Sequence, residues 1–323
     1  MPRKISQIRP DIADPALIAE AARLIRAGKL VVFPTETVYG LGANALDPAA
    51  VASIFEAKGR PATSPLIVHV DSVEMARSVV AEWPDAAARL AERFWPGPLT
   101  LVLPKQDKIP ARVTAGLATV GVRVPRHPIA LALIRAAQVP IAAPSANPFM
   151  GLSPTEACHV RTSLGSRVAL VLDGGPSSVG LESTVVALKE GEAVLLRPGM
   201  ISRADLEAVI GPVRVAAAEP EGEAHPAPGM HARHYSPKTP LLLRPPGAPA
   251  PPGRGVFLCW SEPGSGIRAI QMPADPRAYA AALYSTLHAL DAENLDWIAV
   301  ECPPHQPEWA AILDRLRRAA ATS

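Results

Sequence analysis

The chain has 323 residues, a length that predicts two domains rather than one. Hydrophobic residues make up 48% of it and charged residues 19%, which favours a packed core and argues against a chain that is disordered throughout. The formal net charge is only +2, so the composition argues against a bulk polyanion binder, and any phosphate chemistry requires local clusters of basic residues.

Short apolar runs alternate with helical patterns through the first two hundred residues. The runs expected to form strands are 30–33, 66–70, 99–103, 120–124, 168–172, 183–188 and 193–197. Both hairpin-like and crossover spacings separate them, which favours a mixed sheet over a purely parallel one. We therefore predict an α/β domain over residues 1–212.

The stretch "FPTETVYGLGAN" directly follows the first of these strands. Its threonine hydroxyls can donate and accept hydrogen bonds, and its glycines permit close approach of a ligand. Neither standard phosphate-loop pattern fits, so a tight connection explains this turn equally well. The next helix is expected to start at Asp47-Pro48 and stop at Gly59, which places Lys58 in its last turn and Arg60 just beyond it.

Polar side chains interrupt several apolar segments farther along. His69 lies in "LIVHV", where a histidine is more often a hydrogen-bonded core residue than a catalytic one. Arg123 lies in "VGVRV", and because arginine keeps its charge, burial there requires a bound anion or an internal salt bridge. The segment "SPTE" predicts a capped helix start at Ser153, whose free N–H groups also suit an anion.

Four basic groups of this domain are expected at strand ends or helix ends: Lys58, Arg60, Arg123 and Arg197. With several hydroxyl groups they predict a polar, cationic cavity for a polyanionic small molecule. The chain has no GxSxG motif and no cysteine–histidine arrangement that supports a nucleophile. Catalysis by positioning and charge stabilisation, as in nucleotidyl transfer, fits better.

The cysteine positions and the N-terminal sequence indicate in which cellular compartment the protein is expected. The three cysteines, Cys158, Cys259 and Cys302, lie far apart without a CxxC pair, which argues against a zinc module or a disulfide framework. The N-terminus has no apolar core of signal-peptide length, and no apolar run reaches membrane length. We expect a cytoplasmic protein without a membrane partner.

Residues 213–238 lack strand or helix periodicity and contain "GMHARHYSP". His231 and His234 have a spacing that can ligate a metal, but no third ligand is evident. We favour a different role for this linker, as a lid in which Tyr235 closes over a bound ligand.

Residues 239–323 repeat an α/β rhythm after a proline-rich segment at 245–253. Strands are expected at 241–244, 255–260 and 297–301, with helices starting at Asp275-Pro276 and at about Glu308. This pattern predicts a small, three-stranded, Rossmann-like C-terminal domain.

Several stretches closely resemble the threonylcarbamoyl-AMP synthase family in its longer, two-domain form. They are "FPTETVYGLG", "KGRP…PL", "FWPGPLTLVL", "VGVRVPRHP", "APSAN", "STVV", "RPG" and "HYSP", in the family's order over roughly residues 15–237. One position departs from the pattern, because residue 64 is serine where the family commonly has asparagine.

The resemblance implies a YrdC-like twisted mixed sheet around a cationic cavity. It implies that L-threonine, bicarbonate and ATP give threonylcarbamoyl-AMP and pyrophosphate, with Mg²⁺ accompanying the triphosphate. A separate threonylcarbamoyl transferase complex would then modify the adenosine beside the anticodon of tRNA, so contact with tRNA is expected to be indirect.

The resemblance also implies which residues bind each substrate. L-Threonine would contact Thr37, His69, Arg123, the backbone at Ala143, and Ser183. ATP would contact Lys58, Arg60, Ser64, Thr119, Ser145, Asn147, Ser153, Arg197 and Tyr235. Lys58 and Arg60 would also be the catalytic pair, because they would hold the triphosphate while the carbamate attacks the α-phosphate.

Two other functions compete with this one. Carbamoyl-transferring maturation enzymes use a related domain, but they carry cysteine-rich zinc modules that this chain lacks. A non-catalytic RNA-binding module would show basic runs interleaved with exposed aromatic residues, whereas aromatic residues make up only 4% of this chain.

Overall fold

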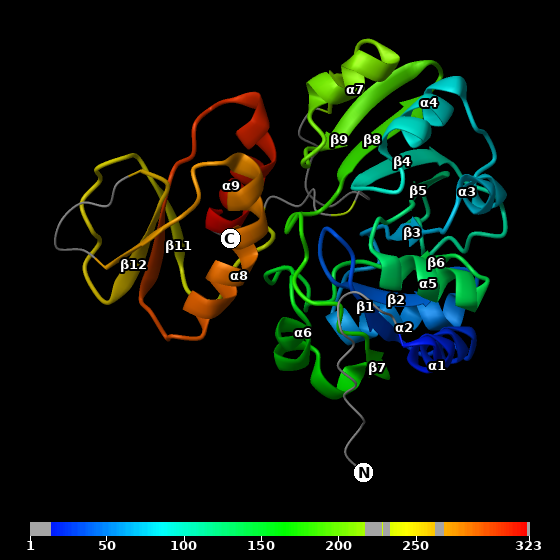
Figure 1. The fold of residues 1–323 in the computed structure, drawn as a ribbon, viewed down its shortest axis with the longest axis horizontal. Helices are drawn as coiled ribbons and strands as arrows, with labels where there is room; N and C mark the ends of the chain where they lie inside the picture. The colour runs from blue at the N-terminus through cyan, green and yellow to red at the C-terminus, as the bar shows by residue number, and fades with distance from the viewer. Residues whose placement is uncertain (1–13, 217–227, 229–232, 262–267, 322–323) are drawn as a thin grey trace.

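The computed structural model describes residues 14–216, 228, 233–261 and 268–321. These residues form two units that lie side by side, one around a ten-stranded sheet and one around a four-stranded sheet (Figure 1). His231, one of the histidines singled out in the linker, lies outside the described residues. Within the described ranges, no helix combines the length and apolar character needed to cross a membrane.

The larger sheet is mixed and runs in the order β10-β9-β8-β4-β5-β3-β6-β2-β1-β7. Its strands are β1 (Val31–Phe33), β2 (Gly40–Asn44), β3 (Ile67–His69), β4 (Leu99–Pro104), β5 (Thr119–Arg123), β6 (Ile141–Ala142), β7 (Leu170–Val171), β8 (Thr184–Lys189), β9 (Glu192–Arg197) and β10 (Arg214–Val215). β1 pairs with β2 antiparallel, whereas β3 pairs with β5 in parallel. The predicted mixed sheet is confirmed.

One strand of this sheet was predicted only as part of a turn. In "PTETVYGLGAN" the threonine half does form a turn, but the glycine half is strand β2. At Gly42 an added Cβ would lie 2.8 Å from the Phe33 ring and 2.9 Å from the Ile141 side chain, so β2 can pack there only with a glycine.

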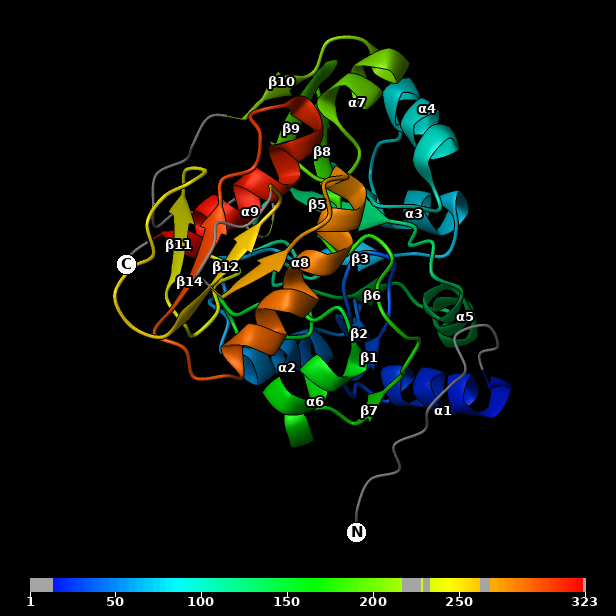
Figure 2. The ribbon, with the colours of Figure 1, turned by 60° about the vertical axis from the view of Figure 1, so that its left-hand side comes forward.

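Helices cover both faces of the larger sheet (Figures 1 and 2). They are α1 (Pro15–Arg26), α2 (Pro48–Lys58), α3 (Val73–Val79), α4 (Asp85–Phe94), α5 (Pro128–Ala137), α6 (Ala157–Ser163) and α7 (Arg203–Ile210), with a 3₁₀ turn η1 (Gly165–Arg167). Along β1 the side chains alternate between faces, so Val31 and Phe33 pack in one hydrophobic cluster with α1 and α5, whereas Val32 packs in the other with α2 and α4.

Local capping chemistry explains the start and end of α2. The Asp47 side chain accepts hydrogen bonds from the N–H groups of Ala49 and Ala50, and Gly59 ends the helix in the left-handed conformation at φ 62°. Both predicted boundaries of this helix are confirmed. They place Lys58 and Arg60 at the end of the helix, next to the loop that follows β6.

The predicted helix start at Ser153 is wrong. The helix α6 begins at Ala157 with Glu156 as its N-cap, and no side chain caps it. Ser153 does not cap because its hydroxyl donates instead to Glu182 Oε1 at 2.5 Å. A tertiary contact has replaced the local one that the sequence pattern favoured.

The smaller sheet is parallel and runs in the order β11-β14-β12-β13. Its elements are β11 (Leu241–Arg244), β12 (Gly255–Cys259), β13 (Ala269–Gln271), α8 (Pro276–Asp291), β14 (Trp297–Glu301), η2 (Pro307–Trp309) and α9 (Ala310–Ala320). The α/β class is confirmed, but the expected three strands are four, because the three-residue edge strand β13 has no recognisable apolar pattern.

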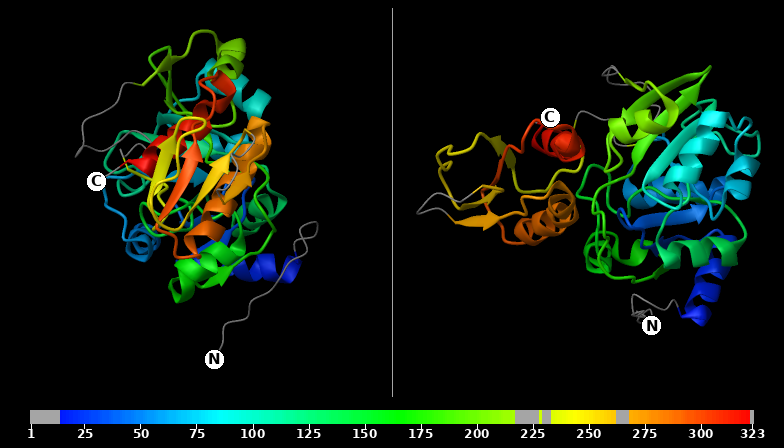
Figure 3. Two further views of the ribbon diagram at one scale, coloured as in Figure 1. Left: turned by 90° about the vertical axis from the view of Figure 1, so that its left-hand side faces the viewer. Right: turned by 45° about the horizontal axis from the view of Figure 1, so that its top comes forward.

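The helices α8 and α9 lie between the smaller sheet and the larger unit (Figure 3). A shared hydrophobic cluster joins Val38, Leu152 and Leu181 of the larger unit to Leu283 and Tyr284 of α8. The two units therefore meet beside the turn that follows β1 and the segment that precedes β8.

Candidate active site

A partly open cavity of about 50 Å³ lies where several strands of the larger sheet end. The predicted site residues that line it are Thr37, Arg60, His69, Arg123, Ala143, Ser145, Ser183, Arg197 and Tyr235. In the parallel β3–β5 ladder His69 pairs with Arg123, so both side chains reach the same edge of the sheet. The fold thus brings most of the predicted residues together.

Arg123 contacts an internal carboxylate, a hydroxyl and a backbone carbonyl. Its side chain is 4% exposed, its Nη2 lies 2.8 Å from Glu36 Oε1, and its Nη1 donates to the Thr37 hydroxyl at 2.9 Å. Its Nε donates to Gly97 O at 3.1 Å. The sequence left open whether the partner of Arg123 is a bound anion or an internal salt bridge. The structure shows an internal carboxylate partner, and Arg123 also lines the cavity, where it can contact an anion.

His69 is a neutral residue in this cavity. Burial, with a further contribution from the positive charge of Arg123, lowers the pKa of its imidazole to about 3. Its ring packs edge-on against Phe33 at a centroid distance of 5.9 Å. His69 therefore offers a neutral hydrogen-bonding group and an aromatic surface rather than a positive charge.

Arg60 and Arg197 form the cationic side of the cavity. Burial lowers the pKa of Arg60 to about 10, and the neighbouring Arg197 contributes to that shift. Arg197 is held from one side by the Ser183 carbonyl, to which both Nε and Nη2 donate at 3.1 Å, and from the other by Pro228 O at 2.8 Å. Two buried guanidinium groups that repel each other make a site for a multiply charged anion.

Lys58 lies behind the wall of the cavity rather than in it. Its Nζ donates to the carbonyl oxygens of Ser145 at 2.6 Å and Asn147 at 2.5 Å. Burial, together with the charge of Arg60, lowers the pKa of Lys58 well below its usual value. In this state Lys58 braces the loop that carries Ser145.

The remaining predicted ATP residues also lie outside the cavity wall. Ser64 accepts from Arg60 Nε through its backbone carbonyl at 3.4 Å, and Asn147 donates to the carbonyls of Pro148 and Gly151. Thr119 lines a separate, smaller hollow on β5, and Ser153 binds Glu182. These residues lie behind or beside the residues that line the cavity. Their contacts with a substrate remain predictions.

Some residues of the cavity were not predicted. Thr35, Glu182, Pro228 and His234 line it, and Glu36 lies directly behind it as the partner of Arg123. Glu36 lies between two threonines in "PTET", and Glu182 lies next to Ser183. Their position beside a predicted substrate contact is the sequence feature that could have identified both glutamates as residues of the site.

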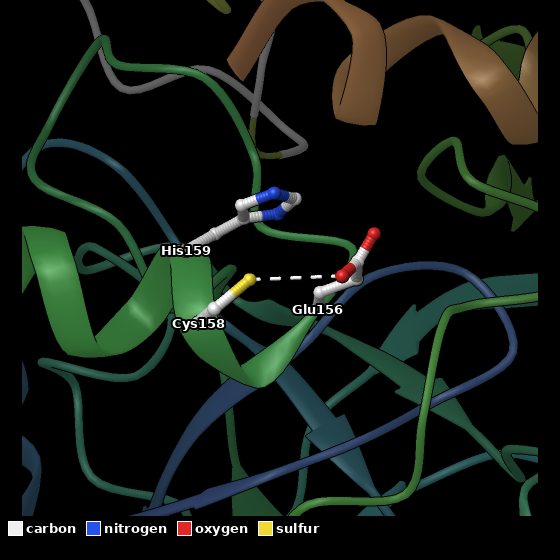
Figure 4. A group of neighbouring side chains, drawn as sticks. All are labelled: Glu156, Cys158 and His159. Atoms are coloured by element: carbon white, nitrogen blue, oxygen red, sulfur yellow. Dashed lines mark hydrogen bonds between the residues drawn. The ribbon is translucent and has the colours of Figure 1, made fainter. Parts of the chain in front are cut away.

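A possible metal-binding group lies away from these residues. The ligand atoms of Glu156, Cys158 and His159 lie within 4.8 Å of one another. Figure 4 shows the three side chains at the start of α6. His159 Nδ1 accepts the backbone N–H of Thr155 at 3.3 Å, and burial together with Glu156 raises the pKa of the Cys158 thiol. None of the three lines the cavity. Local hydrogen bonds account for this arrangement.

Comparisons with known proteins agree with the sequence resemblance. Residues 23–199 match the Sua5_yciO_yrdC family model, described as "Telomere recombination", and residues 201–321 match the "Threonylcarbamoyl-AMP synthase, C-terminal domain" model. The threonylcarbamoyl-AMP synthase of Bacillus subtilis is 44% identical over 94% of this chain and 92% of its own length.

Two archaeal comparisons extend this agreement. The threonylcarbamoyl-AMP synthase of Pyrococcus abyssi is 52% identical over 69% of this chain and 66% of its own length. The crystal structure of P. abyssi Sua5 complexed with L-threonine superposes with a TM-score of 0.90 at 40% identity, covering 98% of this chain and 97% of that one. The chain therefore belongs to the threonylcarbamoyl-AMP synthase family, in its two-domain form.

Proposed function

We propose that the protein makes threonylcarbamoyl-AMP and pyrophosphate from L-threonine, bicarbonate and ATP. The observation that carries this proposal is the arrangement of Arg123 and the Arg60–Arg197 pair around one cavity. An amino acid carboxylate and a triphosphate are both anions, and each finds a buried guanidinium here. The likeness to a protein whose crystal structure holds L-threonine supports the same assignment.

The reaction divides into two steps. The threonine amine first adds to carbon dioxide derived from bicarbonate and forms a carbamate, and water is released in the dehydration of bicarbonate. A carbamate oxygen then attacks the α-phosphate of ATP, the bond to the bridging oxygen breaks, and pyrophosphate leaves. Both nucleophile and electrophile come from substrates, so the protein acts by holding them in line and by stabilising charge.

We assign threonine to the side of the cavity lined by Thr37, His69, Arg123, Ala143 and Ser183. A neutral His69 suits this role, because a cation there would compete for the carboxylate that Arg123 is to bind. The Thr37 hydroxyl, already in contact with Arg123, lies where it can also reach the substrate.

We assign ATP to the opposite side, formed by Arg60, Ser145, Arg197 and Tyr235, with Lys58, Ser64, Thr119, Asn147 and Ser153 supporting it. Lys58 and Arg60 remain the proposed catalytic pair. For Lys58 this requires its ammonium to turn from the carbonyls of Ser145 and Asn147 toward the phosphates.

We propose that the cavity enlarges when ATP binds, because its volume of about 50 Å³ is far below that of a typical small-molecule site. Pro228, His234 and Tyr235 all belong to the segment between the two sheets, and all line the cavity. We propose that this segment, within 213–238, is the lid between a catalytic domain at 1–212 and a C-terminal domain at 239–323.

Mg²⁺ fits this site as a partner of the triphosphate rather than as a resident metal. Glu182 is the acidic side chain among the lining residues that the structure describes, and its oxygens already accept from Ser153, Tyr284 and Arg315. We therefore propose that phosphate oxygens and water hold most of the Mg²⁺ coordination sphere, where the ion would screen the phosphate charge.

The product is a reactive adenylate, so we propose that a threonylcarbamoyl transferase complex receives it in the cytoplasm and modifies tRNA. A non-catalytic RNA-binding role is less well supported. The arginines of the cavity are at most 8% exposed and cannot form an open surface for a nucleic acid; they are Arg60, Arg123 and Arg197.

Pyrophosphate release by the purified protein tests the proposal. Release should require ATP, L-threonine and bicarbonate together, and mass spectrometry should detect threonylcarbamoyl-AMP in equal amount. Omission of either threonine or bicarbonate is the control. Release that continues without threonine would refute the assigned substrate.

A further inference from the structure

We propose that Arg315, in the C-terminal domain, is a positioning residue for the active site in the other domain. The residue lies on α9, 1% exposed, and its side chain crosses the interface between the two units. The inference rests on the proposed function, because it assigns a role to Arg315 in binding ATP.

Arg315 contacts the chain on both sides of the site. Its Nε donates to Glu182 Oε2 at 2.8 Å, and its Nη2 donates to Pro198 O at 3.0 Å. Glu182 directly precedes Ser183, and Pro198 directly follows Arg197. The guanidinium of Arg315 therefore connects the two backbone segments that carry Ser183 and Arg197. Hydrogen bonds from Arg197 to the Ser183 carbonyl connect the same two segments on the cavity side.

Arg315 also holds the linker tyrosine. Its guanidinium carbon lies 5.1 Å from the centroid of the Tyr235 ring, on the face of the ring. On α8, the ring of Tyr284 lies 6.1 Å from the Tyr235 ring, and the Tyr284 hydroxyl donates to Glu182 Oε2 at 3.3 Å. Both helices of the C-terminal domain thus contact Tyr235 and Glu182 together.

The backbone of Tyr235 shows why such support is needed. Tyr235 has a φ of 60°, in the left-handed region that residues with a side chain rarely adopt, and it is 1% exposed. Such a conformation persists only where surrounding contacts hold it. The cation–π contact with Arg315 and the packing against Tyr284 are contacts of this kind, and both come from the C-terminal domain.

The charge arrangement requires an arginine at this position. The Arg315 Nη1 also donates to Asp314 Oδ2 at 2.6 Å, so three directions of the guanidinium are used at once. A lysine keeps the charge but cannot reach Glu182, Pro198 and Asp314 together. A methionine keeps the apolar part of the side chain but leaves Glu182 buried without its cation.

The experiment compares Arg315→Lys and Arg315→Met with the unchanged full-length protein. Arg317→Met, an exposed arginine on the same helix, is the matched control. Thermal unfolding, the KM for ATP and the dissociation constant for L-threonine are measured on each. We expect Arg315→Met to raise the KM for ATP at least tenfold and to weaken threonine binding less, because Ser183 is the one assigned threonine contact on the segments that Arg315 holds. Arg315→Lys should lie in between, and Arg317→Met should match the unchanged protein.

A double variant separates positioning from stability. If Arg315 acts through Glu182, then Glu182→Gln with Arg315→Met should lose no more activity than the worse single variant. This variant also removes the unpaired buried charge, so it serves if Arg315→Met fails to fold. Additive losses, or an ATP KM unchanged in folded Arg315 variants, would overturn the inference. Absence of threonine-dependent turnover in the unchanged protein would instead refute the proposed function.

Discussion

Arg123 Nη2 lies 2.8 Å from Glu36 Oε1, and both side chains are at most 4% exposed. The arginine that we assign to the threonine carboxylate is therefore held in place by an internal carboxylate before any substrate binds. Gly97 and Thr37 accept from its Nε and Nη1, and the guanidinium still has N–H donors left for a substrate carboxylate. Binding then requires little reorganisation of the arginine.

Glu36→Gln should destabilise the protein strongly, because it leaves the buried Arg123 without its counter-charge. Urea unfolding should show a loss of about 3 kcal/mol, as is typical when one partner of a buried ion pair is removed. Glu20→Gln is the control, since it removes a pair with Arg23 of the same 2.8 Å length at 46% and 62% exposure. That change should cost far less, because water screens an exposed pair, and equal losses in both variants would contradict this account.

ATP binding should take up a proton at pH values above the lowered pKa of Lys58. Burial and Arg60 hold the pKa of Lys58 well below its usual value, whereas a neighbouring triphosphate favours the ammonium form. ATP affinity should therefore fall as pH rises through this lowered pKa. Calorimetry in buffers of different ionisation enthalpy measures the uptake, which Lys58→Met should abolish. Binding without proton uptake at any pH would show that Lys58 does not face the phosphates.

Buried histidines should make the fold sensitive to acid. Burial and Arg123 lower the pKa of His69 to about 3, and burial and the stacked His159 lower that of His288 to about 4. The unfolded chain binds protons at both residues from pH 6.5 downward, before the folded chain does. The free energy of unfolding is therefore not reduced by these histidines above pH 6.5. It falls toward pH 4 by about 1.4 kcal/mol per pH unit for each histidine.

Unfolding free energies at pH 6.5 and pH 4.5 measure this loss. His288→Asn should reduce the difference between the two values, because one proton-binding site of the unfolded chain is gone. His305→Asn, at an exposed position, should leave the difference as it is. A pH dependence that is the same in both variants would rule out His288 as a source.

Gly180 marks a close approach of the two units. Its φ is 74°, and an added Cβ would lie 2.5 Å from Ala280 O and 2.6 Å from Ala281 Cα on α8. Gly191 has a similar φ of 81° with nothing within 4 Å. Both alanine substitutions carry the left-handed backbone cost of about 1 kcal/mol, but only Gly180→Ala should also push α8 away. Hydrogen exchange should rise in α8 for Gly180→Ala alone, and equal exchange in the two variants would contradict the close contact.

The sequence predicted features that depend on neighbours along the chain. The Asp47 and Gly59 boundaries of α2 follow from capping chemistry, and the alternation of Val31, Val32 and Phe33 follows from the period of a strand. Ser153 shows the limit, because its hydroxyl binds a glutamate that comes 29 residues later instead of capping a helix.

Contacts between residues far apart in the sequence could not be predicted from local sequence patterns. Glu182 and Arg315 are separated by 133 residues, and the positive φ of Tyr235 depends on contacts from both C-terminal helices. The sequence showed that a charged residue at 123 requires a partner, but not whether that partner is a ligand or Glu36. Only the folded arrangement identifies the internal partner.

The most direct test of the account measures threonine-dependent pyrophosphate release for the unchanged protein and for Arg123→Met. The account predicts release that needs threonine and bicarbonate in the unchanged protein, and a loss of at least a hundredfold in kcat/KM for threonine in the variant, with ATP binding retained. Wild-type kinetics in a folded Arg123→Met protein would contradict the assignment of Arg123 to the threonine carboxylate.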